Sequence, residues 1–248
     1  MDKRKVIFMG NKPVGYKCLK ILINRFNVDL VGVLTKDKKT DVWWSENCRV
    51  YKLAFEHNIP ILNFEDVLEL EVDFIFSVQY HKILKEKILE HPKYGSINLH
   101  MAPLPEYRGC NQFSFAIINK ENEFGTTLHY MDSGIDSGDI IAEKRFQIAD
   151  NIRVNELYSI TEEQSVDLFA ESLDEILGLN NKRIPQDDLI KNKNCHLYKR
   201  SDINKVKEIN LNWNKEKIYR YIRALDFPPF EPPYFKVNNK KVYLTLDY

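Results

Sequence analysis

Apolar positions along the chain change between two spacings. Short apolar runs of strand length lie at Lys5–Gly10, Asp29–Thr35, Val72–Val78 and Gly95–Leu99. The segments between them, in which apolar residues recur at helical spacing, are Lys12–Arg25, Val50–Asn58 and Lys82–Glu90. The first spacing predicts buried strands and the second predicts amphipathic helices. Strands that alternate with helices are typical of an α/β protein with a doubly wound, Rossmann-like, mostly parallel sheet.

The pattern continues in the second half of the chain. A helix is predicted at Asn111–Lys120, and strands are predicted at Phe124–Met131 and Ile140–Phe146. A long amphipathic helix follows at Arg153–Leu177. All of these elements fit the same α/β fold.

The C-terminal region has a different character. A polar, Asn-rich stretch at Gly178–Lys193 leads into an aromatic segment, and we therefore expect a larger domain at residues 1–185 and a small C-terminal domain at residues 186–248. The last stretch, Tyr234–Tyr248, reads as a β-hairpin around an Asn-Asn turn. Because this hairpin is apolar for so small a unit, we expect it to pair two copies of the chain in a homodimer.

Composition excludes several classes of protein. The chain has 36 Lys and Arg against 36 Asp and Glu, so no broad basic surface for nucleic acid is expected. No apolar run is long enough to cross a membrane, and the N-terminal apolar run is too short for a signal peptide. The four cysteines are scattered without a CxxC pair, which favours neither disulfides nor a zinc site. We expect a cytoplasmic protein without a metal ion.

Polar residues gather where the predicted parallel strands end. Asn98 and His100 are two positions apart in a strand, so their side chains point to the same face of the sheet. An amide donor beside an imidazole suits a reaction that builds negative charge on a carbonyl oxygen while a proton moves. The alternative is a polar strand end with a histidine that is hydrogen-bonded to a backbone carbonyl.

The turn from Asp132 to Asp139, DSGIDSGD, adds carboxylates to this region. A calcium loop is excluded because the glycines are misplaced for that motif. A carboxylate beside His100 would orient the imidazole and raise its basicity, and Asp136 is the candidate. Asn98, His100 and Asp136 would then act together on an acyl group.

Three motifs in order carry a resemblance to a known family. They are N-x-H at Asn98–His100, LPxYRG at Leu104–Gly109 and GTTLHxMDxGxDxGDI at Gly125–Ile140. This pattern resembles the folate-dependent formyltransferases, and most closely their nucleotide-sugar N-formyltransferase branch. The resemblance implies an enzyme that transfers a formyl group from N10-formyltetrahydrofolate to a primary amine. In that family the matching Asn, His and Asp are catalytic, here Asn98, His100 and Asp136.

The resemblance also implies the role of each residue. His100 would take a proton from the attacking amine or pass it to the folate nitrogen that leaves. Asn98 would donate a hydrogen bond to the oxygen of the tetrahedral intermediate, and Asp136 would hold His100. The folate would lie along the end of the third strand and the acidic turn; the predicted contacts are Ser77, Gln79, Tyr80, Asp132 and Ile135.

The acceptor is expected to lie near Lys12, after the first strand, and beyond the YRG motif. The predicted substrate contacts are Lys12, Met101, Pro103, Arg108, Gly109, Asn111, Tyr219 and Arg223. Arginines and lysines suit the phosphates of a nucleotide-sugar, and an aromatic side chain suits its base.

The predicted acceptor is a nucleotide-linked amino sugar used for O-antigen or another surface polysaccharide. By resemblance, the leading candidate is dTDP-4-amino-4,6-dideoxyglucose. A 3-amino sugar, a UDP-linked sugar, glycinamide ribonucleotide and methionyl-tRNA remain alternatives. A non-catalytic folate-binding protein is a further alternative, which predicts the loss of a catalytic residue, whereas all three are present.

Overall fold

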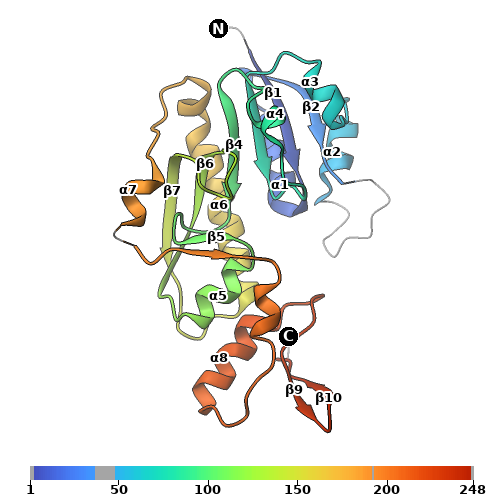
Figure 1. The fold of residues 1–248 in the computed structure, drawn as a ribbon. Coiled ribbons are helices and arrows are strands. Elements are labelled where there is room, and N and C mark those ends of the chain that lie inside the picture. The colour runs from blue at the N-terminus through green and yellow to red at the C-terminus, as the bar shows by residue number, and fades with distance from the viewer. Residues whose placement is uncertain (1–2, 37–47, 192, 247–248) are drawn as a thin grey trace.

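Six strands form the central sheet of the computed structural model, which describes residues 3–36, 48–191 and 193–246 (Figure 1). In spatial order they are β2 (Val28–Leu34), β1 (Arg4–Gly10), β3 (Phe74–Val78), β4 (Gly95–His100), β6 (Glu123–Tyr130) and β7 (Ile140–Gln147). The first four pair in parallel, and β6 and β7 are antiparallel additions at one side. The predicted α/β class and the mostly parallel sheet are confirmed.

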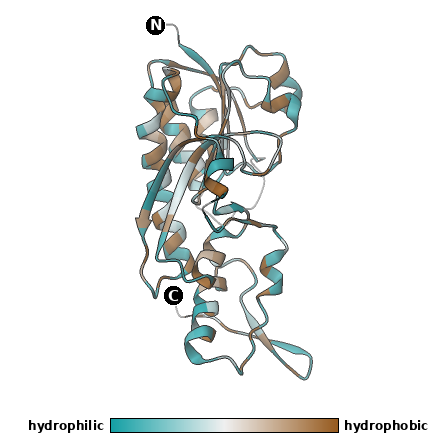
Figure 2. Cartoon of the chain, turned by 60° about the vertical axis from the view of Figure 1, so that its left-hand side comes forward, coloured by the Kyte–Doolittle hydropathy of each residue, from teal (hydrophilic) through white to brown (hydrophobic). Residues whose placement is uncertain are grey.

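Helices pack on both faces of this sheet. The helices of the described residues are α1 (Lys12–Ile23), α2 (Val50–Glu56), α3 (Phe64–Leu68), α4 (Glu86–Leu89), α5 (Gln112–Ile118), α6 (Val154–Leu177), α7 (Gln186–Ile190) and α8 (Lys215–Leu225), with a 3₁₀ turn η2 (Asp202–Lys205). Of these, α1, α2 and α6 lie on one face, and α3 and α4 lie on the other. Hydrophobic and hydrophilic residues alternate along the helices (Figure 2), as expected for elements that bury one side.

Successive side chains of β1 are buried on opposite faces of the sheet. Val6 and Phe8 are buried in the core that also contains residues of α1, α2 and α6, whereas Ile7 and Met9 are buried against residues of α3 and α4. Successive side chains of a strand point to opposite faces, so a continuous apolar run requires a sheet covered on both sides. This is why the apolar runs mark central strands.

Four helices differ from the prediction, and among them α7 and α8 lie in the C-terminal region, where no helix is predicted. The helix expected at Lys82–Glu90 is limited to α4, at Glu86–Leu89. The sequence-based prediction missed α3, whose start is fixed by a capping box in which Asn63 accepts from the Asp66 amide and the Asp66 side chain accepts from the Asn63 amide.

Beyond α6 the chain returns to the larger part of the molecule. The short strand β8 (His196–Tyr198) pairs in parallel with β5 (Tyr107–Gly109), so the C-terminal segment lies directly against the YRG motif. The chain ends in the predicted hairpin of β9 (Tyr234–Val237) and β10 (Lys240–Tyr243), at the bottom of Figure 1. Asn238 and Asn239 both have positive φ, as the tight turn of a hairpin requires. The division at residue 185 stays a prediction.

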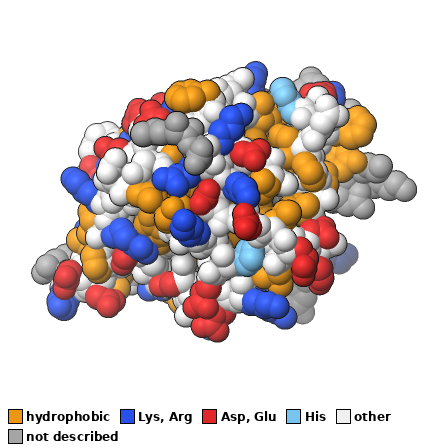
Figure 3. Space-filling view, turned by 90° about the horizontal axis from the view of Figure 1, so that it is seen from above, with side chains coloured by type: hydrophobic (Ala, Val, Ile, Leu, Met, Phe, Trp, Pro, Cys, Tyr) orange, Lys and Arg blue, Asp and Glu red, His pale blue; other side chains and the backbone are white. Residues whose placement is uncertain are grey.

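The surface is mixed in charge. Seen from above, Lys and Arg side chains lie among Asp and Glu side chains over the whole visible face (Figure 3). Among the helices in the described parts of the chain, none is both long and apolar enough to cross a membrane.

Candidate active site

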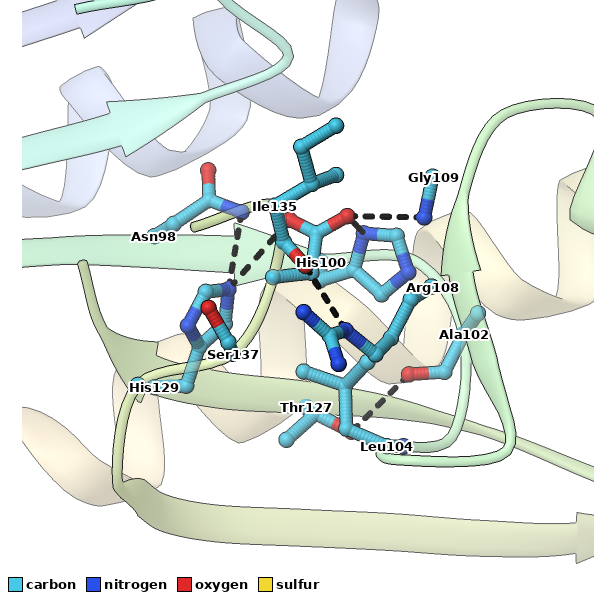
Figure 4. Close-up of polar contacts among 12 residues, drawn as sticks. Asn98, His100, Ala102, Leu104, Arg108, Gly109, Thr127, His129, Ile135 and Ser137 are labelled. Atoms are coloured by element: carbon cyan, nitrogen blue, oxygen red, sulfur yellow. Dashed lines mark hydrogen bonds and ion pairs between the residues drawn. The ribbon is translucent and has the colours of Figure 1, made fainter. Parts of the chain in front are cut away.

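Four side chains from the N-x-H motif and from the motif at Gly125–Ile140 meet near the end of β4 (Figure 4). Asn98 and His100 lie near the end of β4, on one face as their spacing predicts. On β6, His129 is the direct cross-strand partner of Asn98. Asp136 comes from the loop between β6 and β7 and lies between the two histidines. Side chains from two separate motifs therefore form one polar cluster.

Asp136 is held by its backbone and by its neighbours. Its φ is 48°, a left-handed conformation that turns the side chain back toward the sheet. One carboxylate oxygen accepts a hydrogen bond from the Gly109 amide at 2.9 Å and lies 3.7 Å from Nδ1 of His100. The other oxygen lies 3.7 Å from Nε2 of His129. The Gly109 amide therefore fixes the direction in which the carboxylate faces His100.

The surroundings keep this carboxylate ionised. Burial acts to raise the pKa of Asp136, but His100, His129 and the Gly109 amide outweigh it and hold the pKa below its ordinary value. A negative charge is therefore available beside His100 at neutral pH. Such a charge stabilises the imidazolium form of a histidine that accepts a proton.

His100 has one nitrogen committed to the backbone. Its Nε2 lies 2.7 Å from the carbonyl oxygen of Tyr107, and because a carbonyl only accepts, Nε2 carries the hydrogen. In the neutral ring the basic nitrogen is then Nδ1, which is the one that faces Asp136. The alternative considered from sequence, a histidine bonded to a backbone carbonyl, thus describes one side of the ring and leaves the other free to take a proton.

Hydrogen bonds within the acidic turn, and from one residue far away in the sequence, hold this turn. Asp132 accepts from the Gly134 amide at 3.0 Å and from the Ser137 hydroxyl at 2.6 Å. Gln186, which is buried, donates through Nε2 to the carbonyl oxygens of Asp136 and Gly138 at 3.0 and 2.8 Å. The sequence-based prediction missed Gln186, because nothing in its local sequence indicates a contact with a turn fifty residues earlier.

Arg108 also contacts this turn. Its Nε donates to the carbonyl oxygen of Ile135 at 2.7 Å. The predicted phosphate ligand is thus bonded to the predicted folate-binding loop through one nitrogen of its guanidinium group.

The ends of β1 and β3 form the other side of the region. Ser77 is buried and pairs in register with Met9 on one side and Asn98 on the other. Gln79 has a φ of 52° and accepts from Nζ of Lys12 at 3.0 Å. These contacts place the predicted folate segment and Lys12 beside each other.

Asn11 connects the ends of three strands and was absent from the predicted site. Its side-chain amide donates to the carbonyl oxygen of Gln79 at 3.4 Å, and its oxygen accepts from the Thr35 hydroxyl and the Lys36 amide. Its position directly after β1 is the signal that could have identified it.

Several predicted substrate contacts lie elsewhere. Met101 is fully buried in the core and Pro103 is also buried, so neither side chain is exposed at the surface. Arg223 is 6% exposed, donates to the carbonyl oxygen of Ile152 at 2.6 Å and lies over the ring of Tyr219. Both residues are on α8, whose contacts are with α5 and α6.

Two further predicted residues, Asn111 and Tyr80, have defined contacts. Asn111 has a φ of 60° and donates to the carbonyl oxygens of Lys199 and Arg200, which connects the segment after β8 to the YRG motif. Tyr80 is half-buried and packs edge-on against Phe64.

Across residues 3–36, 48–191 and 193–246, no three His, Cys, Asp or Glu side chains form a group that could hold a metal ion.

Comparison with known proteins assigns the family. Residues 45–173 match the family described as formyl transferase. The methionyl-tRNA formyltransferase of Clostridium novyi is 31% identical over 253 residues, which cover 96% of this chain and 79% of that protein.

Solved structures of sugar-modifying enzymes are also similar over nearly the whole chain. The sugar 3N-formyl transferase WlaRD, solved with dTDP and 5-N-formyl-THF, has a TM-score of 0.79 at 29% identity and covers 98% of this chain and 85% of that one. An N-formyltransferase from Helicobacter canadensis, in complex with folinic acid and dTDP-3-aminofucose, has a TM-score of 0.77 at 27% identity over 97% and 86%. With the polar cluster at the matching motifs, these similarities show that the chain belongs to the formyl transferase family and is a formyl-transferring enzyme.

Proposed function

We propose that the enzyme transfers a formyl group from N10-formyltetrahydrofolate to the amine of a nucleotide-linked amino sugar. The observation that carries the reaction is the meeting of Asn98, His100 and Asp136 at one edge of the sheet, with the carboxylate 3.7 Å from the basic nitrogen of the imidazole. The observation that favours a sugar is the similarity to sugar N-formyltransferases over 97% and 98% of the chain, the C-terminal segment included.

The proposed folate site has side chains that suit a pterin. Its segments are the one that follows β3 and the turn after β6, which expose Ile83 and Ile135. A flat ring system with polar edges fits apolar side chains beside backbone hydrogen-bonding groups. We assign the cofactor to Gln79, Tyr80, Asp132 and Ile135, and N10-formyltetrahydrofolate supplies the activated formyl group there.

Each residue of the cluster has a defined task in this proposal. His100 takes a proton from the attacking amine at Nδ1, because its Nε2 is bonded to the Tyr107 carbonyl, and passes it to the folate nitrogen whose bond to the formyl group breaks. Asp136 stabilises the imidazolium that results. Asn98 donates a hydrogen bond to the oxygen of the acyl group as negative charge develops on it, an effect worth about 3–4 kcal/mol for donors of this kind.

A group of positive charges supports an anionic acceptor. Burial lowers the pKa of Lys12, and the nearby charges of Arg200 and Lys36 lower it further. Cations that repel one another at a partly buried position would be stabilised by the diphosphate of a nucleotide. Asn111, which bonds to the backbone of Arg200, fixes that segment beside the YRG motif. We therefore propose Lys12, Lys36 and Arg200 as the diphosphate contacts.

The amine of the sugar could be at position 3 or at position 4, and different observations favour each. The sequence resemblance suggests a 4-amino sugar, whereas the two solved relatives described above are a 3N-formyl transferase and a complex with dTDP-3-aminofucose. We propose a dTDP-linked amino sugar and place both isomers first in the substrate panel.

Methionyl-tRNA is the second candidate acceptor. It is favoured by the 31% identity to the enzyme of Clostridium novyi over 96% of this chain. The balance of 36 basic and 36 acidic residues gives no support to a large phosphate-binding surface, and the face seen in Figure 3 carries both signs of charge.

A panel assay tests the proposal. Purified protein is mixed with N10-formyltetrahydrofolate and, in separate reactions, dTDP-3-amino and dTDP-4-amino sugars, UDP-amino sugars, glycinamide ribonucleotide and methionyl-tRNA, and release of tetrahydrofolate is followed. Turnover with a nucleotide-sugar supports the proposal. Turnover with methionyl-tRNA alone would replace it, and absence of folate binding would remove both candidates. Participation in surface polysaccharide synthesis, a homodimer and a cytoplasmic location remain predictions.

A further inference from the structure

His129 is the one member of the polar cluster to which the proposed reaction gives no task. It lies on β6 directly opposite Asn98 of β4, and it is 2% exposed. Directly opposite residues of antiparallel strands point to the same face of the sheet, so their side chains can contact each other. A buried histidine beside a proposed catalytic amide requires an explanation for where its two ring nitrogens bond.

The backbone fixes the tautomer of His129. Its Nδ1 lies 2.8 Å from the carbonyl oxygen of Tyr130, and because that oxygen only accepts, Nδ1 carries the hydrogen. Burial lowers the pKa of His129 to about 4, against the opposing effect of Asp136, so the ring is neutral in the physiological range. Its Nε2 is therefore a lone-pair acceptor.

This acceptor decides the orientation of the Asn98 amide. Nε2 of His129 lies 3.1 Å from Nδ2 of Asn98, which fits a hydrogen bond donated by the amide (Figure 4). A flipped amide would place its oxygen against the lone pair and near the Asp136 carboxylate, whose own oxygen is 3.7 Å from the same Nε2. Two acceptors on one side thus select the NH₂ end of Asn98, and the second hydrogen of that NH₂ group remains for an acyl oxygen.

We infer that His129 is a positioning residue, which makes Asn98 present a hydrogen-bond donor, and not an acceptor, to the acyl oxygen. The inference rests on the proposed function, in which Asn98 stabilises that oxygen. It assigns His129 no proton transfer, because Nδ1 is bonded to the backbone and Nε2 to Asn98.

Kinetics of four variants and one control variant test the inference. His129→Phe keeps a buried ring but removes the acceptor, and we expect kcat to fall by at least ~10-fold, with the KM for the folate changed by less than about threefold. His129→Gln offers an amide oxygen as a replacement acceptor and should recover most of the loss. Asn98→Ala and the double variant Asn98→Ala/His129→Phe should have equal kcat, because His129 acts through Asn98. His57→Phe, at an exposed position, is the control for the exchange of a histidine for a phenylalanine.

The outcomes separate this inference from the proposed function. Wild-type enzyme without turnover on any acceptor, or Asn98→Ala at full activity, would contradict the proposed function. Loss of activity in Asn98→Ala but normal kcat in His129→Phe would overturn the inference alone, and so would a further loss in the double variant. If His129→Phe does not fold, ¹⁵N NMR of the wild-type imidazole decides: the Nδ1–H tautomer supports the inference, and the Nε2–H tautomer overturns it.

Discussion

Gln186 connects the segment after α6 to the acidic turn at Asp132–Asp139, and replacing it tests whether that connection matters. Its side-chain amide donates to the carbonyl oxygens of Asp136 and Gly138, at 3.0 and 2.8 Å, from a buried position. Gln186→Leu has a similar volume and removes both donors. The perturbation therefore acts on the two hydrogen bonds and leaves the packing nearly unchanged.

The expected magnitude follows from these two bonds. A hydrogen bond contributes about 1 kcal/mol net, and a buried acceptor left without a partner costs somewhat more, so the free energy of unfolding should fall by roughly 2–3 kcal/mol. Asp136 has an unusual backbone conformation, with a φ of 48°, which the surrounding contacts must maintain. A shift of its carboxylate by about 1 Å would lower kcat by up to ~100-fold.

Two measurements on one preparation check this prediction. Chemical denaturation gives the free energy of unfolding, and steady-state kinetics at saturating folate gives kcat. Gln147→Leu, an exposed glutamine on β7, is the matched control and should change neither value appreciably. A Gln186→Leu enzyme with wild-type stability and wild-type kcat would refute the reasoning that this contact holds Asp136 in place.

Three further predictions concern single residues. His100→Asn should lower kcat by at least ~100-fold without unfolding the protein, measured by turnover and circular dichroism, because it removes the proposed proton acceptor. Arg223→Ala should lower the free energy of unfolding by about 2 kcal/mol and leave the KM for the acceptor unchanged, because its guanidinium donates to the Ile152 carbonyl; a raised KM would restore it as a substrate contact. The pKa of His129 is about 4 in the fold against 6.5 for the free side chain, so the unfolded chain binds more protons between these values. The free energy of unfolding should therefore fall by about 3 kcal/mol as the pH decreases from 6.5 to 4. In His129→Phe, chemical denaturation across this pH range should show a decrease that is smaller by this amount.

Local sequence information predicts those features that depend on neighbours along the chain. The apolar runs predict β1, β2, β3 and β4 because central strands bury both faces. The two-residue spacing places Asn98 and His100 on one face for the same geometric reason. The hairpin turn is predicted because Asn238 and Asn239 tolerate positive φ.

Features that depend on tertiary contact are harder to predict. Arg223 has the charge of a phosphate ligand, but helix packing turns it to the carbonyl oxygen of Ile152. Met101 follows the catalytic strand directly, yet it is fully buried in the core. His129 lies opposite Asn98, and this register cannot be read from either segment alone. In each case the type of residue is clear, and its partner is set by a segment far away in the sequence.

Reaction and acceptor choice depend on different parts of this chain. The cluster of Asn98, His100 and Asp136 lies within the segment that matches the formyl transferase family, so the proposal assigns it formyl transfer and not the choice of the amine that receives the formyl group. Overall identity does not decide the acceptor either, because it is 31% to a methionyl-tRNA enzyme and 29% to a sugar enzyme. The proposed acceptor contacts are the cations around Lys12. Arg200 is one of them, and it follows β8, which pairs with β5. Exchange of Arg200 should therefore raise the KM for a nucleotide-sugar and leave the KM for the folate unchanged, which locates acceptor choice in the segment after β8.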